Sequence, residues 1–228
     1  MLNTLVKKAF YKLIIGPLKY GKKDDYNATK YWHDRYLKYG DSIKGPGNES
    51  LTESENWEMY EKAKSIFIET CQKENIDFKK VKLCEIGLGI GFYTKILQAN
   101  ELNNYKGFDI SDVVIPRMKE KFPDYDFEQK DVSTEPLKDK YDVILLIDVI
   151  QHIVNEEKFK YTLNNIASHL NDGGLFIIGP LEKKSAKLLY YVRGWTVDKV
   201  KEIFSSDMYI VSEPISFRGS DLFTIRKK

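Results

Sequence analysis

The sequence predicts an α/β fold, a three-layer sandwich in which helices cover both faces of a mostly parallel sheet. From residue 81 onward, apolar segments of strand length alternate with segments of helical periodicity, which is the pattern of repeated strand–helix–strand units. Residues 141–147 form a nearly unbroken apolar run, as expected for a strand buried on both faces. A glycine-rich segment at residues 87–91 connects one of these strands to a helix.

The N-terminal segment, residues 1–76, is expected to form a helical cap beside a core at residues 77–228. Residues 1–22 place apolar side chains at helical spacing with lysines on the other side, which predicts a basic amphipathic helix that Gly16-Pro17 ends or bends. Its apolar face is expected to pack on its own domain or on a twin subunit in a homodimer. Weak contact with an acidic membrane surface is the alternative. A loop at residues 40–48 and a helix at residues 56–74 follow.

The core elements follow in order along the chain. Strands are expected at residues 82–86, 105–109, 125–130, 141–147 and 175–178, and helices at residues 92–98, 112–121, 156–170 and 196–205. The last two strands, at residues 209–216 and 222–226, are separated by Arg218-Gly219-Ser220. Because hairpin spacing makes such strands antiparallel, the parallel sheet is expected to finish with an antiparallel pair.

Composition excludes several classes of function. The net charge is +2, with charges of both signs mixed along the chain, so no nucleic-acid partner is expected. No apolar run approaches the roughly 18 residues that a membrane span requires. Cys71 and Cys84 lack metal-type spacing, and they are interpreted as reduced thiols of a cytoplasmic protein. The three histidines, His33, His152 and His169, are too scattered to predict a zinc site.

The segment from Glu85 to Gly91 is the strongest functional signal. Gly87, Gly89 and Gly91 alternate after the acid, and glycine lets a ligand approach the backbone where φ is positive. The N–H groups of the following helix would point into the same crevice. In a dinucleotide fingerprint the third glycine comes one residue later, where this chain has Phe92. A glycine-rich turn without a ligand is the alternative.

E-x-G-x-G-x-G at this position resembles the first motif of class I S-adenosylmethionine-dependent methyltransferases. The resemblance implies a seven-stranded sheet whose glycine loop cups the methionine part of S-adenosylmethionine, with Glu85 near its amino group. It also implies that Asp131 meets the adenine amino group and that the backbone N–H of Val132 donates to the ring. Ordinary turn chemistry is the alternative for Asp131.

Asp109, with Ile110 after it, stands at the end of the second expected strand. A carboxylate there can accept both hydrogen bonds of a ribose diol. A helix N-cap is the alternative role for Asp109, although Ser111 or Asp112 would fill it equally well.

Residues 147–153 resemble the fourth motif of the same family. The resemblance implies that Asp148 lines the pocket and that Val149 lies against the cofactor. His152 is open to three interpretations: a structural hydrogen bond to the loop, a general base for an acceptor hydroxyl, or a metal ligand. Asp148 is the second candidate base. Metal-dependent small-RNA methyltransferases have glutamates where this chain has Asp148 and Gln151, and an amide is a weak ligand for a hard cation, so no metal is expected.

The segment at residues 31–36 resembles the Tyr-Trp-x-x-Arg-Tyr opening of several small-molecule methyltransferases, in which it folds over the cofactor. Tyrosine and tryptophan side chains of the segment, Tyr31 and Trp32 among them, would cover the sulfonium, and Arg35 would pair with the cofactor carboxylate. An amphipathic helix with its aromatic residues facing the core is the alternative. A second aromatic and basic cluster is expected to form an acceptor wall; it contains Tyr190, Tyr191, Arg193 and Trp195.

Together these motifs predict transfer of a methyl group from S-adenosylmethionine to an oxygen or nitrogen of a small-molecule acceptor. A sugar or another tailoring-pathway metabolite is the expected class. An oxidoreductase of the nicotinamide type and a binding subunit without turnover are the alternatives.

Overall fold

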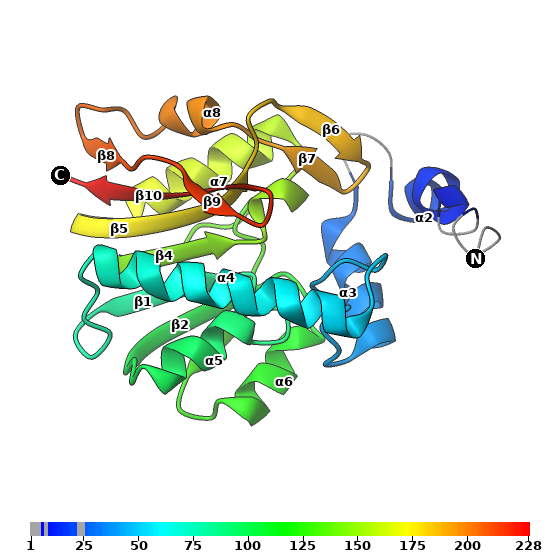
Figure 1. Cartoon of the computed structure of the whole chain (residues 1–228), viewed down its shortest axis with the longest axis horizontal. Coiled ribbons are helices and arrows are strands. Elements are labelled where there is room, and N and C mark those ends of the chain that lie inside the picture. The colour runs from blue at the N-terminus through cyan, green and yellow to red at the C-terminus, as the bar shows by residue number, and fades with distance from the viewer. Residues whose placement is uncertain (1–5, 7–8, 22–25) are drawn as a thin grey trace.

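A computed structural model describes residue 6 and residues 9–21 and 26–228 of the chain. Its main sheet has the strand order β3-β2-β1-β4-β5-β10-β8, and β9 also pairs with β10 (Figure 1). The first five strands run parallel to one another: β1 (Lys82–Ile86), β2 (Asn104–Asp109), β3 (Asp126–Gln129), β4 (Tyr141–Ile147) and β5 (Leu170–Leu181). Because the chain moves outward from β1 in one direction and from β4 in the other, the strand order reverses between these two strands.

The sheet ends in antiparallel strands, as the sequence predicts. β10 (Ser220–Lys227) pairs antiparallel with β5 and, along its other edge, with β8 (Tyr209–Val211) and β9 (Ile215–Phe217). The strand predicted at residues 209–216 is therefore interrupted, and Pro214 in the gap has no N–H to give to a ladder. Since β8 and β9 follow each other along one edge, the sheet has the seven positions expected.

Helices cover both faces of this sheet. One face carries α4 (Glu53–Lys73), α5 (Phe92–Ala99) and α6 (Val114–Lys121), and the other carries α7 (Glu156–Ser168) and α8 (Val197–Lys201) (Figure 1). Each layer has its own core cluster, because successive side chains of a strand point to opposite faces. Val143 and Leu145 of β4 join the cluster under α4 and α5, while Ile144 and Leu146 join the cluster under α7. The predicted three-layer sandwich is confirmed.

Residues 1–76, which were expected to form a helical cap, contribute both to the core and to the cover of the pocket. α4 begins with a capping box, in which Thr52 and Glu55 satisfy each other's backbone N–H groups, and its Ala63 and Phe67 are fully buried in the core cluster. α3 (Ala28–Tyr39) starts with Asn27 as its N-cap and ends at Gly40. α4 is therefore part of a layer of the sandwich, whereas α3 lies beyond the ends of the strands (Figure 1).

The described part of the N-terminal helix packs against the rest of the chain along only a small part of its surface. Within its described residues, a π-helical turn η1 (Tyr11–Ile15) continues into α2 (Gly16–Tyr20), and the change of helix type falls at Gly16-Pro17. Its apolar face was expected to pack on its own domain or on a twin subunit; within this chain only Gly16 and Tyr20 of these two elements are buried. They contact the small hairpin of β6 (Ala186–Leu189) and β7 (Val192–Gly194) through Tyr190. Leu2 and Leu5 lie outside the described residues.

The described residues contain neither a membrane-spanning helix nor a cluster of metal-ligating side chains. None of the described helices is long and apolar enough to cross a membrane. The same residues contain no cluster of three or more histidine, cysteine, aspartate or glutamate side chains that could hold a metal ion.

Candidate active site

A large open pocket lies at the carboxyl ends of the parallel strands, where the order reverses between β1 and β4. It encloses about 1100 Å³ of empty space, part of it open to solvent. Small-molecule sites in α/β sheets are found at this position. The pocket brings together nine of the residues that the sequence singled out: Gly87, Gly89, Asp109, Ile110, Asp131, Val132, Asp148, Val149 and His152.

The first two glycines of the loop form the floor of this pocket. Gly87 and Gly89 have φ angles of 85° and 55°, in the region that side chains with a Cβ rarely adopt. A Cβ on Gly87 would lie 2.1 Å from Cγ2 of Val149, across the strand-order reversal. The loop therefore combines a left-handed backbone with a close approach to the segment after β4, and both require glycine.

Gly91 does not line the pocket. It precedes α5 with a φ of 80°, and a Cβ there would lie 2.8 Å from Phe122 and 2.9 Å from Sδ of Met118. Its role is close packing of the loop against the end of α6. This differs from the ligand contact expected for the third glycine.

Glu85 lies beneath the loop rather than in the pocket. Its Oε2 accepts hydrogen bonds from the hydroxyls of Thr94 (2.9 Å) and Tyr105 (2.6 Å), and its Oε1 has no hydrogen-bond partner among the described residues. Burial raises the pKa of this carboxyl to about 7. The expected position beside the cofactor's amino group is therefore corrected to one that supports the loop from below.

Asp109 connects the ends of β1 and β2. Its Oδ2 accepts the N–H of Gly89 (3.1 Å) and its Oδ1 accepts the N–H of Ser111 (2.9 Å). Burial raises its pKa to about 6, although these backbone hydrogen bonds act in the opposite direction. The carboxyl group both fixes the glycine loop and borders the pocket, so it remains available to hydroxyls of a ligand through its further lone pairs.

Asp131 lies at the far side of the pocket, after β3. Its Oδ1 accepts hydrogen bonds from the N–H (3.0 Å) and the hydroxyl (2.6 Å) of Ser133. This is the turn chemistry that the sequence left open for Asp131. Val132 beside it is buried and also borders the pocket.

Asp148 borders the pocket after β4 but forms an ion pair with Arg218. Its backbone is left-handed (φ 62°), and its Oδ2 accepts a hydrogen bond from Nη1 of Arg218. Burial raises the pKa of Asp148, while the guanidinium of Arg218 opposes that rise. Arg218 is itself fixed over the ring of Tyr60, 4.7 Å from its centroid. A carboxylate held in this way is a poor candidate for accepting a substrate proton.

His152 lines the pocket, and only one of its ring nitrogens is hydrogen-bonded within the described residues. Its Nδ1 lies 2.9 Å from the backbone carbonyl oxygen of Tyr191, which can only accept, so Nδ1 carries the hydrogen. Nε2 has no hydrogen-bond partner in the described part of the chain. Burial lowers the pKa of the imidazole to about 4. The ring is therefore neutral at pH 7, held in one tautomer, and able to accept a proton at Nε2.

Aromatic residues of α3 cover the glycine loop, but Tyr31 and Arg35 do not lie on the side of the helix that was expected. Trp32 and Tyr36 line the pocket, whereas Tyr31 and Arg35 do not. Both pairs have the spacing i, i+4, so each occupies one side of the helix, and the two sides are about 100° apart. The Tyr36 hydroxyl and Pro46 approach Gly89 most closely, at 3.0 and 3.4 Å from the position of an added Cβ.

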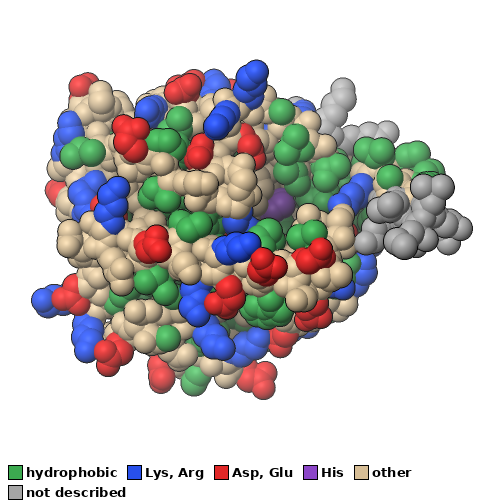
Figure 2. Space-filling model, viewed as in Figure 1, with side chains coloured by type: hydrophobic (Ala, Val, Ile, Leu, Met, Phe, Trp, Pro, Cys, Tyr) green, Lys and Arg blue, Asp and Glu red, His purple; other side chains and the backbone are tan. Residues whose placement is uncertain are grey.

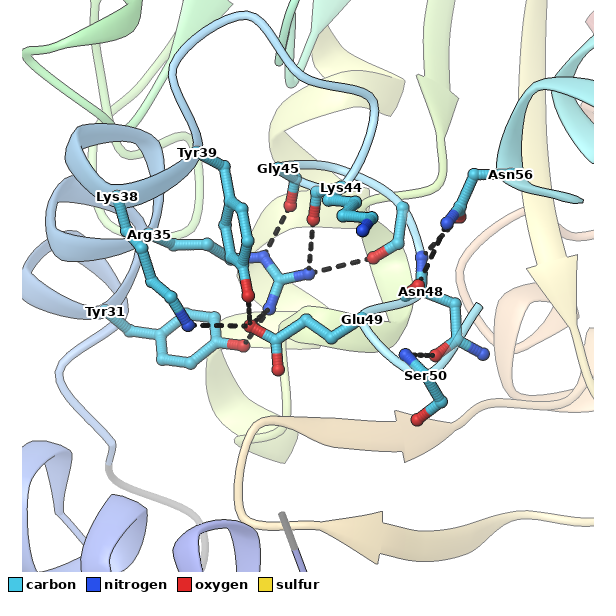
Figure 3. Close-up of polar contacts among 11 residues, drawn as sticks. Tyr31, Arg35, Lys38, Tyr39, Lys44, Gly45, Asn48, Glu49, Ser50 and Asn56 are labelled. Carbon is cyan, nitrogen blue, oxygen red and sulfur yellow. Dashed lines mark hydrogen bonds and ion pairs between the residues drawn. The ribbon is translucent and has the colours of Figure 1, made fainter. Parts of the chain in front are cut away.

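Arg35 holds the loop after α3 in place (Figure 3). Its guanidinium donates to the backbone oxygens of Lys44 (3.0 Å) and Gly47 (2.8 Å), and its Nε donates to that of Gly45. It also lies 3.1 Å from a carboxylate oxygen of Glu49 and donates to the Tyr31 hydroxyl. Because every donor direction is used inside the protein, the expected pairing of Arg35 with the cofactor carboxylate is wrong for this structure.

Residues 31–205 match the sequence profile of a methyltransferase domain. The chain belongs to that family. This match confirms the prediction of a methyltransferase and of its fold. The expected cofactor, S-adenosylmethionine, is consistent with this family.

Solved methyltransferase structures share this fold. The S-adenosylmethionine-bound magnesium protoporphyrin IX methyltransferase of Synechocystis superposes with a TM-score of 0.64 at 17% identity, over 88% of this chain and 95% of that one. The S-adenosylmethionine-bound amino pentose methyltransferase CalS10 of Micromonospora echinaspora gives 0.59 at 11% identity, over 71% and 89%. A match in sequence, 29% identical over 134 residues, is the polyketide synthase component of the compactin nonaketide synthase of Penicillium citrinum. It covers 54% of this methyltransferase but only 4% of that synthase.

The predicted acceptor wall supports the methyltransferase site instead of lining it. Tyr190, Tyr191, Arg193 and Trp195 all lie outside the pocket lining. Arg193 stacks 3.8 Å above Trp195, whose indole N–H donates to the carbonyl of Ile153 (3.0 Å). Together with the bond from His152 to Tyr191, these contacts fix the segment that carries the histidine.

Sequence reasoning missed several residues of this site. Pro46, Tyr60, Phe92 and Tyr93 line the pocket, and the Tyr93 hydroxyl is buried without a hydrogen-bond partner among the described residues. Phe92 directly follows the last glycine of the loop, and this position could have identified it as a pocket residue. Nothing in the sequence marked Tyr60, which reaches the pocket from a helix of the core layer.

Proposed function

We propose that this methyltransferase transfers the methyl group of S-adenosylmethionine to a hydroxyl oxygen of a small-molecule acceptor. When bound, the cofactor supplies a methyl group on a positively charged sulfur. The observation that supports this proposal best concerns His152. This residue lines the pocket as a neutral imidazole in a fixed tautomer, and its Nε2 has no hydrogen-bond partner among the described residues. Such a group suits a hydroxyl, which must lose its proton as its oxygen gains the methyl carbon.

The residues of the pocket fit this cofactor. Gly87 and Gly89 line the pocket with bare backbone, Asp109 has lone pairs for a ribose diol, and Asp131 and Val132 border the far end of the same pocket. The unpartnered Tyr93 hydroxyl adds a polar group beside Asp148. Trp32 and Tyr36 would cover the region of positive charge, which an aromatic face stabilises.

The chain's own contribution to the reaction is position, exclusion of water and removal of one proton. Trp32 contacts the imidazole edge-on, with ring centroids 4.9 Å apart, and Tyr60 packs edge-on against Phe92 (4.8 Å). These rings give the acceptor side of the pocket an apolar lining. The hydroxyl proton of the acceptor would pass to Nε2 of His152 and from there to solvent. A ring-bearing acceptor with an exposed hydroxyl, such as a sugar, fits this arrangement.

Isothermal titration and a transfer assay test the proposal. S-adenosylhomocysteine should bind to the purified protein, and oxidised nicotinamide dinucleotide should not. Incubation with S-adenosylmethionine carrying a labelled methyl group and a panel of hydroxyl and amine acceptors should label hydroxyls. Binding of the dinucleotide instead would favour an oxidoreductase, and transfer restricted to amines would remove His152 as the base. Cofactor binding with no turnover on any acceptor would favour a binding subunit.

A further inference from the structure

The N-terminal helix formed by η1 and α2 exposes a row of large apolar side chains. Phe10, Leu13 and Leu18 are 52%, 68% and 67% exposed, and Val6, Ile14 and Ile15 are exposed as well. In Figure 2, hydrophobic side chains gather at this end of the molecule, next to the grey residues. Contiguous exposed apolar side chains on a protein surface mark a site of interaction.

Contacts made by Gly16 and Tyr20, on another side of the helix, attach it to the rest of the protein and leave the row of apolar side chains exposed. Gly16 lies so close to Tyr190 that an added Cβ would be 2.6 Å from its ring. Tyr20 stacks on the same ring with centroids 6.4 Å apart, and its hydroxyl donates to Asp34 (2.9 Å). The helix is therefore attached to the body through Gly16 and Tyr20, and its apolar row remains exposed.

The charge of the segment indicates what covers this row. Residues 1–23 contain six lysines and neither an aspartate nor a glutamate, although the whole chain has a net charge of only +2. Lys19 is paired with Asp34 (2.7 Å), and the excess of positive charge comes from the other lysines of the segment. The remainder of the chain is net acidic, so the positive charge is concentrated in this part of the sequence.

We propose that this helix docks the methyltransferase on the surface of an anionic lipid bilayer. An exposed apolar row combined with a local excess of lysine is the composition of helices that lie in the plane of a membrane interface. The apolar side chains would enter the boundary between headgroups and acyl chains, and the lysines would face anionic headgroups. The helix would lie on the bilayer and not cross it.

A second copy of the chain fits the same surface less well. Two such helices packed against each other would bring two lysine-rich, acid-free segments together, and like charges across an interface weaken association. An anionic bilayer satisfies both the apolar row and the charge. A dimer formed through this helix is therefore the alternative that the experiment below must be able to detect.

The docked surface would lie close to the catalytic pocket. Tyr20 and Tyr190 belong to one buried cluster with Tyr26 and Val154, and the last two of these line the pocket. One layer of packed side chains thus connects the helix to the pocket wall. This proposal does not depend on which acceptor is methylated.

Vesicle cosedimentation of the full chain tests the proposal. We expect binding to vesicles of phosphatidylcholine mixed with phosphatidylglycerol, at least about tenfold weaker binding to phosphatidylcholine alone, and weakening by added salt. The double variant Leu13→Ser and Leu18→Ser should weaken binding to anionic vesicles by at least about tenfold. The matched control is Met208→Ser with Ile210→Ser, which removes two side chains that are 55% and 58% exposed at the C-terminal edge of the sheet. The control should bind like the unaltered protein.

Parallel measurements separate this proposal from the catalytic one. Thermal unfolding and S-adenosylhomocysteine affinity should be unchanged in both double variants, because all four side chains are exposed and outside the pocket. Absence of binding to anionic vesicles, equal binding to both vesicle types, or an equal loss in the control would overturn the proposal. A dimer in solution that the Leu13 and Leu18 variant dissociates would assign the surface to a second copy instead.

Discussion

Arg218 forms an ion pair with Asp148, although 70 residues separate them in sequence. Arg218 occupies the turn between β9 and β10, where its own φ is 53°, and Asp148 follows β4. The antiparallel end of the sheet thereby reaches back to the pocket. The guanidinium also lies 4.7 Å from the centroid of the Tyr60 ring and contacts Sδ of Met59 (3.3 Å), which joins α4 to the same point.

Replacing Arg218 by methionine is expected to destabilise the protein by about 3–5 kcal/mol, the cost of leaving a buried charge without its partner. The pKa of Asp148, already raised by burial, should rise further. Asp148→Asn in the same protein should recover part of the loss, and chemical denaturation of the two single variants and the double variant measures the coupling. The control is Arg226→Met at the more exposed pair with Glu74, for which about 1 kcal/mol or less is expected. Equal losses for Arg218 and Arg226 would contradict this account.

Arg35→Met is expected to weaken S-adenosylhomocysteine binding by about tenfold, or about 1.4 kcal/mol. The reason is indirect: without the guanidinium, three backbone carbonyls of residues 44–47 lose their donors, and Pro46 would no longer be held against Gly89. Hydrogen exchange in the cofactor-free protein should accelerate at residues 43–48. Lys38→Met, an exposed neighbour on the same helix that reaches Glu49 only at 4.0 Å, is the control.

The two roles considered for Arg35 give different results. If it paired with the cofactor carboxylate, affinity would fall while exchange in the cofactor-free loop stayed unchanged. Arg35→Lys also distinguishes them, because a lysine can pair with a carboxylate but cannot bond three carbonyls at once. We expect the lysine variant to resemble Arg35→Met.

The sequence predicted those parts of the site that follow from strand ends. Asp109 is the last residue of β2, Asp131 lies two residues after β3 and Asp148 directly follows β4. Parallel strands bring their carboxyl ends to one edge of the sheet. Gly87 and Gly89 were identifiable because a left-handed turn beneath a ligand leaves few alternatives to glycine. Gly91 has the same backbone conformation, but tertiary packing against Met118 and Phe122 decides its role.

Residues outside that edge were predicted less well, for physical reasons. An amphipathic helix was the alternative considered for residues 31–36, and the sequence pattern did not specify which i, i+4 pair would face the pocket. In the structure Trp32 and Tyr36 face the pocket, whereas Tyr31 and Arg35 do not. Arg35 lies on the side of the helix that faces the loop at residues 44–47, to which it is hydrogen-bonded. Arg218 was identified only as part of a turn, because its contact with Asp148 depends on how the last strands fold back.

His152 is expected to act as a base with an unusually low pKa. Burial lowers the pKa of the imidazole to about 4 from an ordinary 6.5, so the neutral form persists as pH falls through 6.5. We therefore expect kcat/KM for a hydroxyl acceptor to show no acid limb near pH 6.5, whereas an exposed histidine would give one. An acid limb at the ordinary histidine pKa would contradict the structure.

Two substitutions separate catalysis from support of the loop. His152→Ala and His152→Asn should both lower kcat by about 10²–10⁴-fold, the usual contribution of a general base, with S-adenosylhomocysteine affinity nearly unchanged. Asparagine retains an N–H near the position of Nδ1, so it can still donate to the Tyr191 carbonyl. Full activity of the asparagine variant alone would show that the histidine is structural.

Glu85 predicts a pH dependence of stability with a definite sign. Burial raises its pKa to about 7 from 4.5, so between these values the folded protein retains a proton that the unfolded chain has lost. Stability should therefore decrease as pH rises from 4.5 to 7. Glu85→Gln keeps an oxygen for the hydroxyls of Thr94 and Tyr105 and removes the ionisation. Across this range the variant should gain up to about 3 kcal/mol relative to the unaltered protein.

Glu128→Gln is the matched control for this experiment because it should change in the opposite direction. Glu128 lies on β3, and despite its desolvation, hydrogen bonds from Lys106 and Lys130 lower its pKa. Its ionised form therefore stabilises the folded state above the ordinary carboxyl pKa, and the stabilisation is lost as pH falls. The glutamine variant should become less stable than the unaltered protein as pH rises, which denaturation at a series of pH values will measure. If both variants changed in the same direction, the raised pKa would not belong to Glu85, and Asp109, with a pKa of about 6, would be the next group to replace.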